Sequence, residues 1–387
     1  MAHVRDEFEA ITESAPLVDE LRRRIAASGP ITFREFMAAA LYHERHGYYP
    51  ARPQATSRGG DYVTSPEVHP VFGALVGRQL AEMWRALGSP PAFDVIEQGA
   101  GAGLLARDII RRSLRQDPDF AAALRYHIVE PIPALRAAQQ RTLEREPGAG
   151  AAVRWHDTLP RQITGCVLSN ELVDAFPVHR VFRDGSGLHE VYVGVEDRRF
   201  VERLAPPSTP RITSYFDALG LLPGEGCYAE VNLEALDWMR DVAAALTRGF
   251  VLTFDYGYDA ADLYAPWRRD GTLLCFHAQS ASSDPFVRIG KQDITASVDF
   301  TSLRRAGEDA GLRTLAFTGQ ASFLVRLGIG EAVAAARDTH PDSMEEYFAR
   351  RRVVMDLIDP GRLGRIKVLL QGKDAPPTPL TGFSGDA

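Results

Sequence analysis

Residues 93–110 read FDVIEQGAGAGLLARDII, and the fold can be worked out from this stretch. The apolar run at 93–96 predicts a buried strand, and the residues from Leu104 onward predict a helix. Between them stand Gly99, Gly101 and Gly103. Glycine lets the backbone turn sharply from strand to helix and lets a ligand approach the chain closely. We therefore expect a ligand-binding turn, with a tight turn that binds nothing as the alternative.

The spacing of these glycines distinguishes between two kinds of cofactor. A dinucleotide-binding loop, G-x-G-x-x-G, would need glycine at position 104, which is Leu104, whereas the third glycine here comes one residue earlier. The spacing G-x-G-x-G is typical of class I methyltransferases. Their donor, S-adenosylmethionine, has no phosphate and presents a ribose, an adenine and a zwitterionic amino acid. We expect this donor to contact Gly99, Ala100, Gly101 and Gly103.

Acidic side chains stand at the ends of three successive predicted strands. Glu97 ends the first strand and suits the cationic end of the donor. Glu130 ends the second and is placed to accept hydrogen bonds from both ribose hydroxyls. Asp157 follows the third and could accept a hydrogen bond from the adenine amino group. These three acids strengthen the prediction of a donor site.

The fourth predicted strand, GCVLS, is followed by Asn170, Glu171 and Asp174. Ligands of open α/β sheets bind at the carboxyl edge near the switch point of strand order, so these three are our catalytic candidates, and Asn170 is also a donor contact. Methyl transfer needs a nucleophile aligned with the sulfonium methyl. Glu171 and Asp174 could together grip an arginine guanidinium and accept its proton. The alternative is that Asn170 or Glu171 caps the following helix.

The rest of the chain extends this α/β pattern. From Ala92, short apolar runs alternate with amphipathic stretches, which predicts βαβ units and a parallel sheet covered on both faces. Earlier in the chain, Ser65 is expected to cap a helix that begins at Pro66. We expect the chain to divide into four regions. A helical region at 1–90 closes over the cofactor site, and a donor-binding Rossmann-like core follows at 91–258, with a hairpin inserted near 178–230. A helical substrate or cap region with late sheet strands occupies 259–372, and a disordered tail occupies 373–387.

Composition argues against several classes of protein. The 387 residues include 44 Lys and Arg against 51 Asp and Glu, a net charge of −7, whereas nucleic-acid binders carry a basic patch. The three cysteines, Cys166, Cys227 and Cys275, have neither disulfide nor zinc spacing, and we expect no metal. No window resembles a signal-peptide core or a membrane span. We therefore expect no nucleic acid, no membrane insertion and a cytoplasmic location.

Together these motifs resemble the MidA-type class I methyltransferases, relatives of the mitochondrial complex I assembly factor that methylates arginine. The resemblance implies a Rossmann-like α/β fold with a mostly parallel seven-stranded sheet, S-adenosylmethionine as donor and S-adenosylhomocysteine as product. It also implies that a loop at 60–66, including Asp61 and Thr64, helps close the donor site. The segments that carry it are FREFM (33–37), HGYY (46–49), GDYVTSP (60–66), EQGAGAG (97–103), NELVDAFP (170–177), DYGY (255–258), DIT (293–295), VDF (298–300) and KVL (367–369).

The methyl acceptor is the part of the function that the sequence defines least. In characterised relatives the resemblance implies symmetric dimethylation of an arginine on a respiratory-complex subunit, so a methyl-acceptor protein is our first expectation. The family usually has histidine in D-[LI]-T-x-H-V-D-F, where this chain has Ser297. A small-molecule methyltransferase diverged from the family is therefore one alternative, and a non-catalytic assembly factor is another. The oligomeric state stays open, with a homodimer among the expectations.

Overall fold

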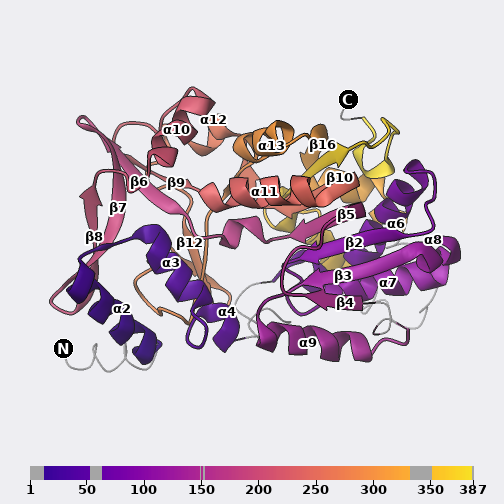
Figure 1. The fold of residues 1–387 in the computed structure, drawn as a ribbon, viewed down its shortest axis with the longest axis horizontal. Helices are drawn as coiled ribbons and strands as arrows, with labels where there is room; N and C mark the ends of the chain where they lie inside the picture. The colour runs from indigo at the N-terminus through magenta and orange to yellow at the C-terminus, as the bar shows by residue number, and fades with distance from the viewer. Residues whose placement is uncertain (1–12, 53–62, 149, 151–152, 332–350, 386–387) are drawn as a thin grey trace. The chain divides into compact units, whose positions relative to one another are not determined.

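The computed structural model describes residues 13–52, 63–148, 150, 153–331 and 351–385. The chain divides into two units, and each has a sheet of its own (Figure 1). Unit 1 comprises residues 1–62, 173–238 and 257–303, and unit 2 comprises 63–172, 239–256 and 304–387. These divisions differ from the expected boundaries at 90, 258 and 372, because the chain leaves unit 2 and returns to it twice.

Unit 2 is built on a seven-stranded sheet in which β17 alone runs antiparallel to its neighbours. Almost every position of β5 is buried, as expected for a central parallel strand with helices on both faces. The predicted mostly parallel α/β sheet is confirmed. In spatial order the strands are β16 (Arg313–Gly319), β17 (Lys367–Lys373), β10 (Leu246–Asp255), β5 (Ile163–Asn170), β2 (Phe93–Gln98), β3 (Leu124–Val129) and β4 (Val153–His156).

The helices of unit 2 bury one apolar side each. Phe72, Val76 and Leu80 of α6 join Leu105 and Ile109 of α7 and the sheet strands in one core. Figure 1 shows α6, α7 and α8 next to the strands β2, β3 and β5 of the same unit. The helical segments are α5 (Ser65–Val68), α6 (Val71–Ala86), α7 (Leu104–Gln116), α8 (Pro118–Ala123), α9 (Pro133–Glu144), α14 (Gln320–Arg326), η3 (Leu363–Arg365) and η4 (Thr381–Phe383), while α11 (Leu233–Ala245) and α13 (Phe300–Asp309) contribute residues to both units.

The first helix of unit 2 begins one residue earlier than the sequence predicts. Thr64, rather than Ser65, is the N-cap of α5, and Pro66 is the second helical residue. The Thr64 N–H donates to Glu67 Oε2 at 2.9 Å, which is one half of a capping box. As the first helical residue, Ser65 has no intrahelical acceptor for its N–H.

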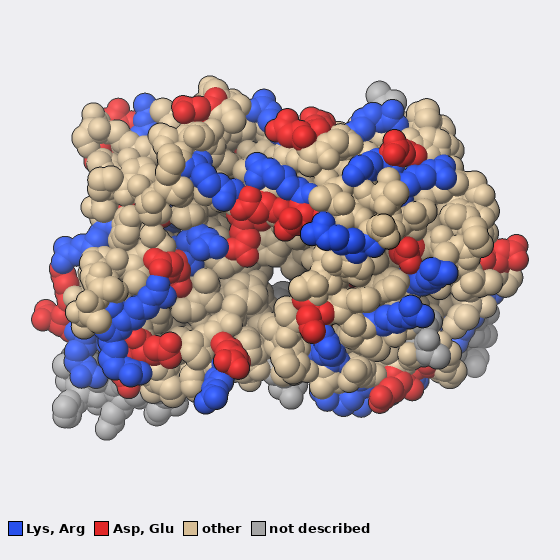
Figure 2. Space-filling view, in the orientation of Figure 1, with Lys and Arg blue, Asp and Glu red and all other residues tan. Residues whose placement is uncertain are grey.

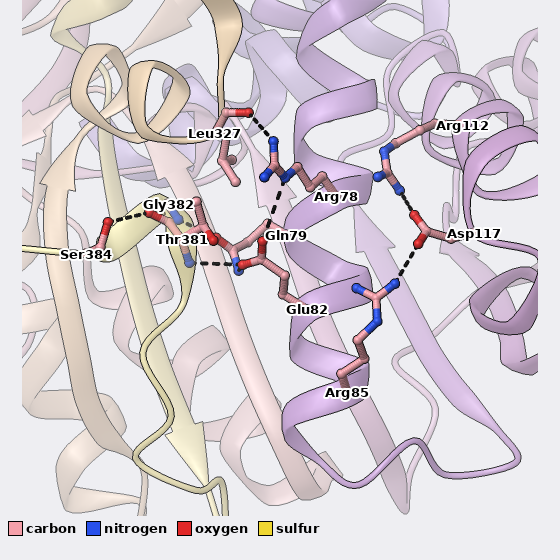
Figure 3. Close-up of polar contacts among 10 residues, drawn as sticks. All are labelled: Arg78, Gln79, Glu82, Arg85, Arg112, Asp117, Leu327, Thr381, Gly382 and Ser384. Atoms are coloured by element: carbon pink, nitrogen blue, oxygen red, sulfur yellow. Dashed lines mark hydrogen bonds and ion pairs between the residues drawn. The ribbon is translucent and has the colours of Figure 1, made fainter. Parts of the chain in front are cut away.

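The C-terminal segment of unit 2 is ordered, so the prediction of a disordered tail at 373–387 is wrong for its described residues. Figure 3 shows how η4 attaches to α6. The Gly382 N–H donates to Gln79 Oε1 and the Thr381 N–H donates to Glu82 Oε2, both at 2.9 Å. Leu380 and Phe383 of this segment are buried in the core of unit 2.

Unit 1 is built on an antiparallel sheet of five strands in the order β1, β7, β6, β9, with β8 also paired to β7. Asp184 of β6 pairs with Gly187 of β7, so these two strands form a hairpin within the segment near 178–230 where the sequence predicts one. The described residues of this unit form one apolar core under α2 and α3 and another that includes α10 and α12. The elements are α2 (Ala15–Ser28), β1 (Ile31–Thr32), α3 (Phe33–Tyr42), α4 (Tyr48–Ala51), η2 (Val173–Ala175), β6 (His179–Asp184), β7 (Gly187–Glu196), β8 (Arg199–Ala205), α10 (Pro210–Leu219), β9 (Cys227–Val231) and α12 (Ala260–Leu263).

Two smaller sheets in unit 1 were not expected. The predicted helical region at 259–372 contains β12 (Leu274–His277), which pairs with β13 (Ser280–Ser282) and β14 (Asp293–Thr295). β11 (Gly257–Tyr258) pairs with β15 (Val298–Asp299). These strands have two to four residues, too few to produce an alternating apolar pattern in the sequence.

The surface carries both signs of charge. On the face that Figure 2 shows, Lys and Arg side chains are interspersed with Asp and Glu in each unit. Among the described helices, none is long and apolar enough to cross a membrane.

Candidate active site

The carboxyl ends of three central strands of unit 2 lie side by side. The parallel register pairs Gln98 of β2 with Ser169 of β5, and Asn170 with Phe254 of β10. The strand order proceeds outward from β2 in both directions, toward β3 and β4 and toward β5 and β10. This is the switch point at which open α/β sheets bind ligands, so the glycine loop and the Asn170 segment meet at the expected edge.

The glycine loop has the strained backbone that only glycine adopts without cost. Gly99, Gly101 and Gly103 have φ of +74°, +49° and +79°. A Cβ on Gly99 would lie 2.9 Å from Cδ1 of Leu172, so the loop packs closely against the segment that follows β5. Ala100 is buried, and its carbonyl accepts a hydrogen bond from the Gly103 N–H at 2.7 Å. The predicted turn from strand to helix is confirmed.

Glu130 follows β3 and is almost completely buried, with 5% of its surface exposed. Its carboxylate accepts hydrogen bonds from the Ile132 N–H and from the side-chain amide of Gln139, each at 3.0 Å. Burial raises the pKa of Glu130 above its usual value, and these two hydrogen bonds oppose that rise. The carboxylate is thus held in a fixed position at the edge where the ribose is expected.

The other two acidic residues that are predicted to contact the methyl donor differ from each other in burial. Glu97 is 2% exposed and accepts a hydrogen bond from the Tyr126 hydroxyl at 2.7 Å, and burial raises its pKa to about 7. Asp157 follows β4, is largely exposed and forms an ion pair with Arg136. Glu97 is therefore a buried sheet residue with a partner of its own, and its predicted contact with the donor stays a prediction, as does that of Asp157.

Asn170 and Glu171 form a hydrogen-bonded pair at the end of β5. The Asn170 side-chain amide donates to Glu171 Oε1 at 3.0 Å, and the Ser65 N–H donates to the same oxygen at 3.1 Å. Glu171 has φ of +50°, a strained conformation for a residue other than glycine and one that clusters at functional sites. The helix-capping alternative is not realised for Glu171, because its carboxylate binds the N-terminus of α5, a helix 106 positions earlier in the chain.

The carboxylate of Glu171 holds its proton unusually tightly. The residue is partly exposed, but loss of hydration around the carboxylate raises its pKa to about 8. The hydrogen bonds from Ser65 and Asn170 lower this pKa, whereas the neighbouring carboxylates of Asp255 and Glu67 raise it. Strongly perturbed acids of this kind are concentrated at active sites.

Sequence reasoning missed three residues that build this edge. Asp255, at the end of β10, is completely buried, and its Oδ2 accepts a hydrogen bond from the Leu172 N–H at 3.2 Å. Ser65 supplies the N–H that binds Glu171, and Gln139 holds Glu130. Asp255 could have been found by the strand-end rule that identified Glu130. Ser65 lies in the 60–66 segment, but its hydrogen bond to Glu171, 106 positions away, has no local signal in the sequence. Nor has the hydrogen bond from Gln139 to the Gly101 carbonyl, 38 positions away.

The structure describes two of the three remaining predicted residues. Asp174 belongs to unit 1, in the 3-10 helix η2, where its side chain is buried and its carbonyl accepts a hydrogen bond from the Ala296 N–H at 2.9 Å. Thr64 belongs to unit 2 as the N-cap of α5. Asp61 lies outside the described residues. Within the described parts of the chain, no group of three or more His, Cys, Asp or Glu side chains could hold a metal ion.

The geometry of unit 2 fits S-adenosylmethionine. Asn170 Oδ1 is buried and has no hydrogen-bond partner among the described residues. This oxygen can therefore accept a hydrogen bond from a ligand beside the glycine loop. Gly99 and Gly101 present backbone without side chains, and Glu130 presents a fixed carboxylate. The fold and this edge together define a class I methyltransferase, in which the donor lies across the carboxyl ends of the central strands.

Comparison with known proteins identifies the family. Residues 75–318 match the family of S-adenosyl-L-methionine-dependent methyltransferases, and the chain belongs to this family, which is of the MidA type. It is 32% identical to the mitochondrial protein arginine methyltransferase NDUFAF7 homolog of Drosophila melanogaster, over 91% of this chain and 84% of the fly protein. It is 30% identical to NDUFAF7 of Homo sapiens, over 81% of this chain and 74% of the human protein.

A solved structure from Burkholderia thailandensis, a methyltransferase-type protein bound to S-adenosyl-homocysteine, is also similar. It has 33% sequence identity and a TM-score of 0.87, and the match covers 96% of this chain and 95% of that chain. This chain is therefore a methyltransferase that uses S-adenosylmethionine and releases S-adenosylhomocysteine.

Proposed function

We propose that this protein methylates the guanidinium group of an arginine in a protein acceptor, during assembly of a respiratory complex and in the cytoplasm. The observation that carries the proposal is the Glu171 carboxylate, which is held by Asn170 and by the start of α5 and has its pKa raised to about 8. A guanidinium is cationic at every working pH, so it needs a carboxylate both for binding and for removal of a proton. The names of the fly and human relatives, both arginine methyltransferases, support this acceptor.

The residues of unit 2 have separate tasks in this proposal. Bound S-adenosylmethionine supplies an electrophilic methyl group on a sulfonium. The glycine loop from Gly99 to Gly103, including Ala100 and Gly101, holds the donor through its backbone, and Glu130 accepts hydrogen bonds from the ribose. Glu97 lies toward the donor's cationic end, and Asp157 accepts a hydrogen bond from the adenine amino group. Thr64, the N-cap of α5, is proposed as a further contact of the donor.

The acceptor side depends on Asn170, Glu171 and Asp174. Asn170 fixes the Glu171 carboxylate with its amide and offers its Oδ1 to the donor. Glu171 binds one guanidinium nitrogen and accepts the proton that this nitrogen releases as the new N–C bond forms. A cation beside Glu171 lowers the pKa of its carboxyl, so acceptor binding itself prepares the base. Asp174 is proposed as the second carboxylate that binds the guanidinium.

Ser297 favours a second candidate acceptor, a small molecule. Its N–H donates to Thr272 Oγ1 at 3.1 Å, and its hydroxyl replaces the imidazole that the family usually has at this position. If that imidazole contacts the acceptor in relatives, its loss changes what the site selects.

A labelling experiment distinguishes these candidates. The purified protein is incubated with methyl-labelled S-adenosylmethionine and host lysate, beside Glu171→Gln protein as a control, and the label is separated by molecular size. Label recovered from protein as dimethylarginine, and absent with the control variant, is the expected result. Label only in the small-molecule fraction establishes the second candidate, and no transfer in either fraction favours an assembly factor without catalysis.

A further inference from the structure

Gln139 lies on α9 with its side chain completely buried. Its amide Nε2 donates to Glu130 Oε2 at 3.0 Å and to the Gly101 carbonyl at 3.2 Å, and its Oε1 accepts from the indole N–H of Trp155 at 3.0 Å. One side chain therefore joins the glycine loop, the acid after β3 and the edge strand β4.

The indole of Trp155 determines which way this amide points. An indole N–H only donates, so the oxygen of Gln139 must face Trp155, and the NH₂ group must then face Glu130 and Gly101. Backbone packing adds to this restraint, because a Cβ on Gly103 would lie 3.2 Å from the Cα of Gln139. The helix α9 is thus pressed against the glycine loop at the point where the amide bridges it.

We propose that Gln139 is a positioning residue of the donor site, which holds the Glu130 carboxylate and the glycine loop at a fixed separation so that one S-adenosylmethionine contacts both. The proposal rests on the donor-binding role assigned to Glu130. A donor that bridges two separately held groups binds most tightly when their spacing is set before it arrives. Trp155 supports this role by orienting the amide.

Replacement of Gln139 by glutamate gives the sharpest test. Gln139→Glu keeps the size and the acceptor for Trp155 but places a second carboxylate against Glu130. Two carboxylates at hydrogen-bond distance share a proton. At low pH the shared proton restores a hydrogen bond to Glu130, and as pH rises both groups ionise and repel. We expect S-adenosylhomocysteine to bind this variant within about threefold of wild type at pH 5.5 and more than about 10-fold more weakly at pH 8.5.

The wild-type profile over the same pH range is the baseline for this measurement. The other titratable or charged groups near the pair are Arg136 on α9 and His156 and Asp157 at the end of β4, and all three are present in both proteins. Gln140→Glu is the matched control, since Gln140 is the exposed neighbour on the same helix. It adds the same charge without facing Glu130, so its binding should follow wild type at every pH.

Apolar replacement tests the same bridge without adding a charge. Gln139→Leu removes the hydrogen bonds that Gln139 makes to Glu130, Gly101 and Trp155. We expect about 10-fold to 100-fold weaker binding, with kcat at saturating donor less affected than KM for the donor. Calorimetric titration with S-adenosylhomocysteine measures affinity, and the melting temperature of the unliganded protein checks folding. If the leucine variant does not fold, Trp155→Phe is measured instead, and we expect it to bind S-adenosylhomocysteine about threefold more weakly than wild type does.

Two outcomes separate this inference from the proposed donor site. If Glu130→Ala weakens binding but the Gln139 and Trp155 variants bind within about twofold of wild type at every pH, the positioning role is overturned and the donor site stands. If Glu130→Ala itself binds as wild type does, the donor-site assignment fails and the inference fails with it.

Discussion

The side-chain amide of Asn170 donates to the carboxylate of Glu171 at 3.0 Å, on the same oxygen that accepts the Ser65 N–H. Both donors favour the ionised form of Glu171, yet loss of hydration and the nearby carboxylates of Asp255 and Glu67 raise its pKa to about 8. The two donors therefore hold the base in one orientation, while lost hydration and the neighbouring carboxylates keep its proton affinity high. A cationic acceptor suits this arrangement, because it favours ionisation of the carboxyl as it binds.

Glu171→Gln should abolish most methyl transfer and leave donor binding intact. The amide keeps the size of the side chain but cannot accept the proton of the acceptor nitrogen. We expect kcat to fall by about 100-fold or more and the affinity for S-adenosylmethionine to stay within about twofold of wild type. Initial rates with labelled donor and calorimetric titration measure the two quantities. Asp174→Asn should give a loss in the same direction with donor binding unchanged.

Glu144→Gln is the matched control for this prediction, because Glu144 is exposed on α9. Its rate and donor affinity should equal those of wild type. A Glu171→Gln enzyme that transfers methyl groups at the wild-type rate would remove Glu171 from the mechanism.

Glu130→Ala should weaken binding of both S-adenosylmethionine and S-adenosylhomocysteine. The two ligands share the ribose that Glu130 is proposed to bind, so the loss should be similar for both, about 10-fold to 100-fold. NADH should not compete, since the loop spacing is not that of a dinucleotide site. Equilibrium titration and displacement assays test this, with Glu144→Ala as the exposed control. Equal affinity in the variant, or tight NADH binding, contradicts the assignment.

The sequence predicted the central sheet of unit 2 and its functional edge well, for physical reasons. The strand of Phe93–Gln98 and the glycines after it follow local rules of burial and backbone freedom, and both appear as expected. Glu130 and Glu171 lie at strand ends, and parallel strands bring their ends to one edge whatever the details of packing.

What the sequence could not predict depends on partners far along the chain. The Ser65 N–H binds Glu171 from 106 positions away, and Gln139 reaches the glycine loop from 38 positions away. The same reason explains the error at the C-terminus, where Gly382 binds Gln79, 303 positions earlier. Composition indicates whether an isolated segment would stay in solvent. It does not show whether another part of the fold binds that segment.

Glu97→Gln should change how stability depends on pH. Burial raises the pKa of Glu97 to about 7, so the folded protein binds this proton more tightly than the unfolded chain does. Its contribution to stability is full below the unfolded pKa of 4.5 and is lost as pH rises through 7. A shift from 4.5 to about 7 corresponds to about 3 kcal/mol. The glutamine variant keeps an acceptor for Tyr126 and loses this dependence.

Urea denaturation at pH 5, 7 and 9 measures the effect. The stability of Glu97→Gln relative to wild type should rise between pH 5 and pH 9. Glu144→Gln, on the exposed face of α9, should follow wild type throughout. Parallel curves for Glu97→Gln and wild type would show that Glu97 titrates normally in the folded protein.

Phe383→Ala should destabilise the protein, because the C-terminal segment belongs to the core of unit 2. Phe383 is 8% exposed, and its ring centroid lies 5.2 Å from that of the completely buried Phe323. Removal of this ring leaves a cavity beside Phe323, and we expect a loss of about 2 to 3 kcal/mol in the free energy of unfolding. Thr378→Ala, at an exposed position of the same segment, should cost less than about 0.5 kcal/mol. Urea midpoints distinguish the two variants. A disordered tail would make both substitutions silent, so equal midpoints for Phe383→Ala and wild type would contradict the docking of η4 on α6.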